Sequence, residues 1–143
     1  MAATLAKVGY GSLLKRGDGG GTEVFTAIAE LLSFSLASSL DTVEATHMES
    51  PSSAKEFIAG LLDMGEVTAE CNFLNDATQN LAAGVQLDMK NRTKRNWQLY
   101  IVSNTTNTIS FTGFVTGITR KATVQDKITL EVKIKITGLP TEA

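Results

Sequence analysis

Apolar and polar residues alternate along much of the chain, which predicts a mainly β protein. The alternation is most regular in residues 127–137, where every second residue is apolar: Ile128, Leu130, Val132, Ile134 and Ile136. Residues 65–74, 97–102 and 108–119 alternate in the same way, and we expect Gly113 and Gly117 to mark bends or bulges. Residues 25–36 and 41–48 favour extended structure more weakly, and helix stays possible at 24–32. We therefore expect about six strands.

One segment has a helical period. Between residues 76 and 89, apolar residues recur every fourth position, at Ala77, Leu81, Val85 and Met89. Asp76 can cap this helix, and Gln79 stands three residues later, as in a capping box. The short apolar segment at residues 54–62 predicts a helical turn.

Two stretches interrupt the periodic pattern. Residues 1–22 are rich in glycine and predict an N-terminal arm, and residues 42–56 predict a long inter-strand loop broken at Pro51. Gly138, Leu139 and Pro140 are expected to end the last strand. The predicted organisation is an arm at 1–22 and a single domain at 23–143, an antiparallel β-sandwich or barrel with one flanking α-helix.

The composition excludes most site chemistry. One Cys and one His cannot form a disulfide framework or a Cys/His zinc site, so we expect neither metal nor cofactor. Cys71 falls on the apolar face of its predicted strand, as a small core residue. A hydrolase would have to use His47 as its base, and no Gly-x-Ser-x-Gly elbow accompanies it. We therefore predict that the protein is not an enzyme.

Apolar stretches and the N-terminal segment indicate where the protein is made. No apolar stretch approaches the roughly 20 residues that span a bilayer. Lys7 and Lys15 interrupt the N-terminal segment, which has no secretory apolar region, so synthesis in a cytoplasm is expected.

Charge is divided unevenly. Residues 1–90 hold 12 acidic and 5 basic side chains, a net charge of −7, whereas residues 91–143 hold 3 acidic and 8 basic ones, a net charge of +5. A basic third can indicate nucleic-acid binding, or it can meet the acidic part of a neighbouring copy. Head-to-tail contacts join unlike surfaces and therefore suit the second interpretation.

An ordered series of short motifs carries a family resemblance. It runs KVGYG at 7–11, a glycine-rich turn before Thr22, IAE at 28–30, SFS at 33–35, DTVEATHMES at 41–50, KEFIAGLL at 55–62, DMGE at 63–66, FTGFV at 111–115 and TGLP at 137–140. This series resembles the major tail tube proteins of tailed double-stranded DNA bacteriophages, of the siphophage type.

The resemblance implies a structural virion protein of the tail, made in the host bacterial cytoplasm. Its subunits would form hexameric rings that stack into a hollow tube, with inner strands of neighbouring subunits joined into a barrel. The expected partners are the chain itself, the tape measure protein, and the tail terminator and tail-tip proteins. Double-stranded DNA would pass through without sequence-specific binding, and no membrane would be involved.

The resemblance also implies where copies meet. Residues 2–22, 42–56 and 138–143 would make ring-to-ring contacts. The expected subunit and ring contacts are Tyr10, Leu13, His47, Met48, Ser50, Pro51, Phe57, Lys133 and Lys135. The two lysines are included because lysines lining a lumen would retain DNA phosphates. We expect them opposite acidic groups from residues 41–70.

Three alternatives remain beside this interpretation. A tube protein of a phage-like device, such as a tailocin or secretion system, is a close variant. A nucleic-acid-binding β-barrel would use the basic third of the chain, and a small hydrolase would use His47.

Overall fold

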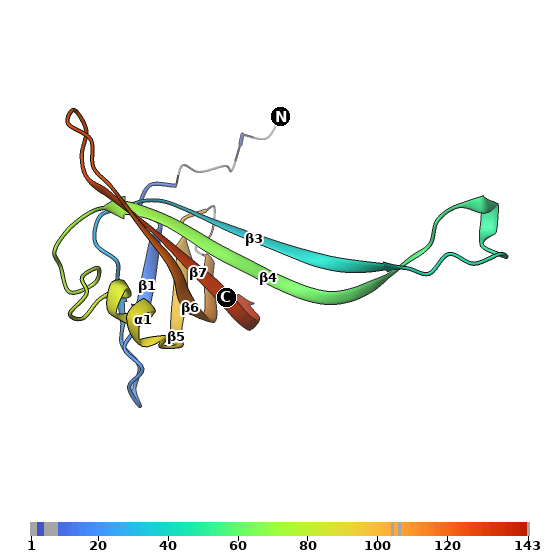
Figure 1. Ribbon diagram of the computed structural model, residues 1–143, viewed down its shortest axis with the longest axis horizontal. Helices are drawn as coiled ribbons and strands as arrows, with labels where there is room; N and C mark the ends of the chain where they lie inside the picture. The colour runs from blue at the N-terminus through green and yellow to red at the C-terminus, as the bar shows by residue number, and fades with distance from the viewer. Residues whose placement is uncertain (1–2, 5–8, 104, 106, 143) are drawn as a thin grey trace.

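One curved, antiparallel sheet forms most of the molecule in the computed structural model, which describes residues 3–4, 9–103, 105 and 107–142 (Figure 1). The described strands are β1 (Leu13–Gly17), β2 (Phe25–Ala27), β3 (Leu31–Glu44), β4 (Phe57–Asn72), β5 (Arg95–Ile101), β6 (Asn107–Lys121) and β7 (Thr129–Glu142). They follow the order β2-β1-β5-β6-β7-β4-β3 in a seven-stranded sheet. The predicted mainly β, antiparallel architecture with one helix is confirmed.

The core lies on one face of this sheet, because alternate residues of the long strands point to the same side. The predicted apolar face of residues 65–74 is buried at Val67, Ala69 and Cys71. The remaining buried apolar side chains are Leu14, Ile28, Val85, Trp97, Leu99, Phe111, Val115, Leu130, Val132, Ile134 and Ile136. Ile128 is an exception, since it precedes β7 and its side chain is 48% exposed.

The helix is shorter than its sequence pattern predicts. Helix α1 spans Val85–Asn91, and residues 76–84 form turns, so the prediction of a helix over 76–89 is wrong for its first half. Asp76 accepts hydrogen bonds from the backbone and hydroxyl of Thr78, which closes a turn. Gln79 is fully buried and donates to the carbonyl oxygens of Ala29 and Asn72, both outside the segment. These bonds to distant backbone replace the expected capping box.

Strand pairing extends further than the sequence predicts. Residues 57–62 belong to β4 and not to a helical turn, and β3 continues to Glu44, so the connecting loop is 45–56. A short 3₁₀ helix, Pro51–Ser53, lies in that loop. Strand β7 continues through Gly138 to Glu142 instead of ending at residues 138–140. Strand β1 lies within the segment expected to be an arm, so the expected lack of regular structure is wrong for Leu13–Gly17. The register shift at Gly117 confirms a bulge there.

The sheet divides at one side into two branches. Residues 66–72 of β4 pair with β7, but residues 57–65 pair only with β3, and this hairpin leaves the body of the molecule (Figure 1). Residues 136–142 of β7 pair with β6 and not with β4. Gly65 lies at the division with a φ of +81°, and a Cβ there would lie 1.4 Å from the carbonyl oxygen of Ala37. Only glycine fits this close approach of two backbones.

Candidate assembly surfaces

The β3–β4 hairpin presents apolar side chains to solvent on both of its faces. Leu40 lies opposite Leu62, and Val43 lies opposite Ile58. Phe57 and Ile58 are successive residues of β4, and so are Leu61 and Leu62, so exposed apolar side chains lie on both faces of the hairpin. The side chains of both cross-strand pairs are more than half exposed, and so is that of Phe57, one of the expected contact residues. A ribbon that is apolar on both faces is typical of a surface covered by other chains.

The loop at the end of this hairpin is held by hydrogen bonds around Glu56. The Ser50 hydroxyl donates to Glu56 Oε2 at 2.7 Å, and His47 Nε2 lies 3.4 Å from the same oxygen. The Glu49 backbone N–H donates to His47 Nδ1, so this nitrogen acts as an acceptor. His47 therefore shapes the loop, and Ser50 bonds to a carboxylate and not to the imidazole as a nucleophile would. Met48 projects fully into solvent.

Among the strand edges that lack a neighbouring strand in the described residues, that of β3 and that of residues 114–121 of β6 could pair with each other in two copies. Strand β3 ends the strand order, so one side of its whole length has no strand beside it in the described chain. Strand β6 pairs with β5 only at residues 107–113, so no described strand lies on the same side of residues 114–121, where Arg120 donates a hydrogen bond to Gln86 of α1. Free edges present unpaired N–H and C=O groups, and a long one acts as a template for another chain.

The expected arm contributes to a groove near the start of β3. Tyr10 and Leu13 line this groove, whose volume is about 920 Å³, together with Ile28, residues 30–34 and residues 101–102. Tyr10 is 91% exposed. Residues 1–2 and 5–8 of the arm, and residue 143 of the expected C-terminal contact, lie outside the described residues.

The two lysines of β7 have acidic partners in their own chain. Lys135 Nζ lies 3.0 Å from Asp63 Oδ1, and this hydrogen bond, with one from the Gly65 backbone, lowers the pKa of Asp63 below its ordinary value. Lys133 Nζ lies 3.9 Å from a carboxylate oxygen of Glu131. Lys135 of β7 thus pairs with a carboxylate of β4, so part of the charge division is balanced inside one subunit. Contact of either lysine with another copy stays a prediction.

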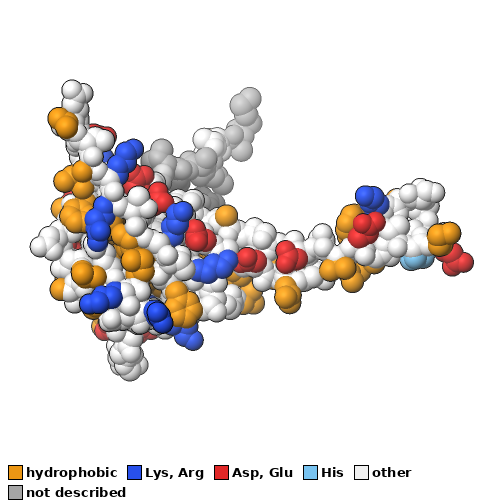
Figure 2. All heavy atoms as spheres, in the orientation of Figure 1, with side chains coloured by type: hydrophobic (Ala, Val, Ile, Leu, Met, Phe, Trp, Pro, Cys, Tyr) orange, Lys and Arg blue, Asp and Glu red, His pale blue; other side chains and the backbone are white. Residues whose placement is uncertain are grey.

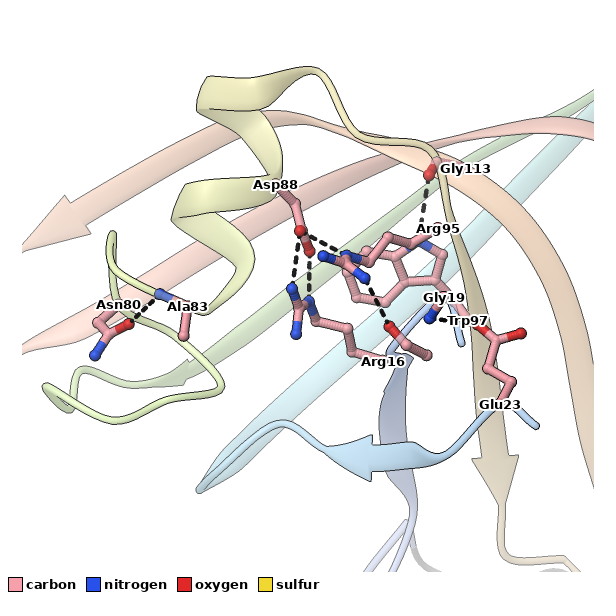
Figure 3. Close-up of polar contacts among 10 residues, drawn as sticks. Arg16, Gly19, Glu23, Asn80, Ala83, Asp88, Arg95, Trp97 and Gly113 are labelled. Atoms are coloured by element: carbon pink, nitrogen blue, oxygen red, sulfur yellow. Dashed lines mark hydrogen bonds and ion pairs between the residues drawn. The ribbon is translucent and has the colours of Figure 1, made fainter. Parts of the chain in front are cut away.

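A buried ion cluster fixes α1 against the sheet (Figure 3). The Asp88 carboxylate has no exposed area, and it accepts hydrogen bonds from Arg16 Nη2 at 2.9 Å and from Arg95 Nε at 2.6 Å. Arg16 belongs to β1 and Arg95 opens β5, so one carboxylate joins three elements. Sequence reasoning missed this cluster, because no local spacing connects positions 16, 88 and 95.

The described residues contain little else that supports chemistry. No group of three His, Cys, Asp or Glu side chains among them could hold a metal ion. In that same part of the chain, no helix has the length and apolar character needed to cross a membrane. Burial raises the pKa of the Cys71 thiol to about 11, and its sulfur lies 3.5 Å from the Leu130 carbonyl oxygen, so it is a core group.

Solved structures with the same fold are tail tubes and related assemblies. The tail of an empty gene transfer agent particle, with C6 symmetry, has a TM-score of 0.74 at 19% identity, covering 90% of this chain and 93% of that one. The SPP1 tail tube has a TM-score of 0.70 at 7% identity, covering 92% and 75%. The PVC sheath/tube terminator of an extracellular contractile injection system has a TM-score of 0.70 at 15% identity, covering 99% of both chains. At these identities the likeness shows the fold.

The family comparison goes further than the fold. No match was found among curated proteins. The model of the family described as lambda phage tail tube protein, TTP, matches residues 22–143, which is most of the chain. This is a family of structural proteins of the phage tail and not of enzymes. The chain therefore belongs to the lambda phage tail tube protein family.

Proposed function

We propose that the chain forms six-membered rings that stack into the hollow tube of a phage tail or phage-like particle, and that double-stranded DNA passes through this tube. The observation that carries the proposal is the pair of unequal strand edges, β3 and residues 114–121 of β6. If β3 of one copy pairs with the free part of β6 of the next, the same contact repeats around a ring. Such head-to-tail contacts close when the rotation allows, and closure removes the exposed edges.

Support for the number six comes from the C6 symmetry of the structurally similar gene transfer agent tail. The two-sided apolar hairpin supports stacking, because its length carries it away from its own subunit toward other copies (Figure 1). Burial of these side chains in the tube would contribute roughly 25 cal/mol for each Å² removed from water.

The charge pattern suits a passage for DNA. Lys133 and Lys135 lie within reach of Glu131 and Asp63, so their charges are already compensated in one chain. Compensated lysines bind phosphate weakly, and each phosphate contact avoided lowers the retention of DNA.

The proposal includes the partners that a tube needs: a tape measure protein in the lumen during assembly, and terminator and tail-tip proteins at the ends. Similar folds occur in the tube-terminating cap of the anti-feeding prophage and in the PVC sheath/tube terminator. These likenesses also support the variant in which the particle is a phage-like device.

Electron microscopy of the purified chain at rising concentration tests the proposal. We expect rings and hollow tubes for the wild type and loss of both for Ile58→Asp, which places a charge on the exposed hairpin. Val24→Asp is the matched control, since Val24 is 59% and Ile58 57% exposed and only Ile58 lies on the hairpin. Monomers alone at every concentration and salt condition would contradict the proposal. Salt-dependent binding of a short oligonucleotide by such monomers would favour the nucleic-acid-binding alternative.

A further inference from the structure

A cleft opens where the β3–β4 hairpin and the end of β7 diverge. Its volume is about 480 Å³. The side chains that matter for its chemistry are Asp41, Leu61, Leu62, Met64, Ile136 and Leu139. Leu61 is 83% and Leu139 75% exposed, so the apolar walls of the cleft are uncovered in the single subunit.

Both walls also offer backbone groups. Residues 57–65 of β4 pair with β3 on one side only, and residues 136–142 of β7 pair with β6 on one side only. The open side of each strand faces the division between the branches. The cleft thus combines apolar side chains with unpaired strand edges, which is what binds an inserted segment of another chain.

At the other end of β7 an exposed turn projects from the molecule, with lysines in and beside it where the cleft carries carboxylates. Residues 122–128 form the turn between β6 and β7, and all of them are exposed (Figure 1). Val124 projects fully into solvent, and Figure 2 shows an apolar side chain near the end of this projection. Lys121 directly precedes the turn and Lys127 lies within it, and neither has an ion-pair partner among the described residues.

Charge also distinguishes the two ends. The cleft contains Asp41, which has no ion pair in the described part of the chain, and Asp63, whose charge is shared with Lys135. The turn contains Lys127 and the carboxylate of Asp126, and Lys121, the last residue of β6, directly precedes it, so these positions together carry one net positive charge. An acidic, apolar cleft therefore lies at one end of β7 and a basic, apolar turn at the other.

We propose that the turn at residues 122–128 of one copy enters this cleft in a second copy of the chain. Val124 packs between Leu61 and Leu139, and Lys121 or Lys127 lies beside Asp41. The two features cannot meet in one subunit, because residues 129–135 of β7 lie between them and span roughly 20 Å. They meet when copies stack head to tail, so the inference rests on the proposed function and names the contact between successive rings.

Disulfide trapping tests the contact directly. The double variant Val124→Cys with Leu61→Cys is assembled into tubes and oxidised under mild conditions. The two new thiols lie too far apart to join within one chain, since bridged Cα atoms lie within about 7 Å. We expect a ladder of covalent multimers on a denaturing gel. Buried Cys71, with its raised pKa, does not react.

The control pairs Val124→Cys with Leu81→Cys, a side chain 53% exposed and outside the cleft. Tubes that give no ladder for Val124 with Leu61, or an equal ladder for both pairs, would overturn the inference while the proposed function stands. A wild type that forms no tubes would instead overturn the proposed function.

A second variant keeps the inference testable if the cysteine pair fails to assemble. Val124→Asp should raise the protein concentration needed for tubes by at least about tenfold. The double charge exchange of Lys127→Glu with Asp41→Lys should assemble better than Lys127→Glu alone. Wild-type assembly by Val124→Asp would contradict the contact.

Discussion

Replacing the carboxylate that joins α1 to the sheet should strongly destabilise the subunit. Asp88→Ala leaves the guanidinium groups of Arg16 and Arg95 without their shared partner, and their side chains are only 15% and 18% exposed. Removing one member of a buried ion pair costs about 3–5 kcal/mol. The partial exposure of both arginines lets water reach them, so we expect a value of about 3 kcal/mol, toward the lower end of that range. That is a large share of a total stability of about 5–15 kcal/mol.

Urea unfolding followed by tryptophan fluorescence measures this effect. The chain has a single tryptophan, Trp97, which is fully buried and donates a hydrogen bond to the Gly113 carbonyl oxygen. Its emission therefore reports the loss of the core. On heating, about 3 kcal/mol corresponds to a fall in Tm of roughly 6–12 °C for a domain of this size.

The exposed Asp41 provides the matched control. Asp41→Asn should change the free energy of unfolding by no more than about 0.5 kcal/mol. A cost below about 1 kcal/mol for Asp88→Ala, in the range of an exposed ion pair, would refute the argument that this cluster fixes the helix.

Three further results are expected from the same structure. In urea unfolding, Gly65→Ala should lower the free energy of unfolding by about 2–4 kcal/mol, because the added Cβ would collide with the Ala37 carbonyl oxygen at a positive φ. Gly21→Ala is the control and should be neutral, because the space around Gly21 is open. A neutral Gly65→Ala would contradict the close approach of the two backbones at the branch. The Cys71 thiol, with a pKa of about 11, should resist a thiol reagent at about pH 8 until the protein unfolds, and rapid labelling of the folded protein would show that the core is open. The pKa of Asp63 in the folded protein lies below its ordinary value of 3.8, so the stabilising contribution of this carboxylate is present above pH 3.8 and is lost as the pH falls through the folded-state pKa. The difference in unfolding free energy between wild type and Asp63→Asn should therefore shrink in acid. A difference that does not depend on pH would contradict the Lys135 contact.

Much of the fold follows from local periodicity. The alternation around Val67 and Val132 predicted two strands, because burial of one face imposes a period of two on a strand. In the structure these two strands pair with each other in the core. The helix was overpredicted because a four-residue repeat also fits a series of turns. Gln79, which fitted the capping box, instead bonds to Ala29, a residue 50 positions away.

The assembly surfaces were predicted less completely. The family resemblance implied contacts at residues 42–56 and in the arm. Phe57 and Met48 are exposed, and their contact with another copy stays a prediction. The division of the sheet at Gly65, and the cleft that it creates, depend on which strand pairs with which, and no local pattern encodes that. The charge division similarly suggested contacts between copies, whereas the fold first brings Lys135 to Asp63 of the same chain.

The most direct test of the tube is a cryo-EM reconstruction of the assembled protein. We expect six subunits per ring around an open lumen, with the free edge of β3 hydrogen-bonded to residues 114–121 of β6 in the neighbouring subunit. A reconstruction in which β3 remains an unpaired edge, or in which the subunits form no closed ring, would contradict this expectation.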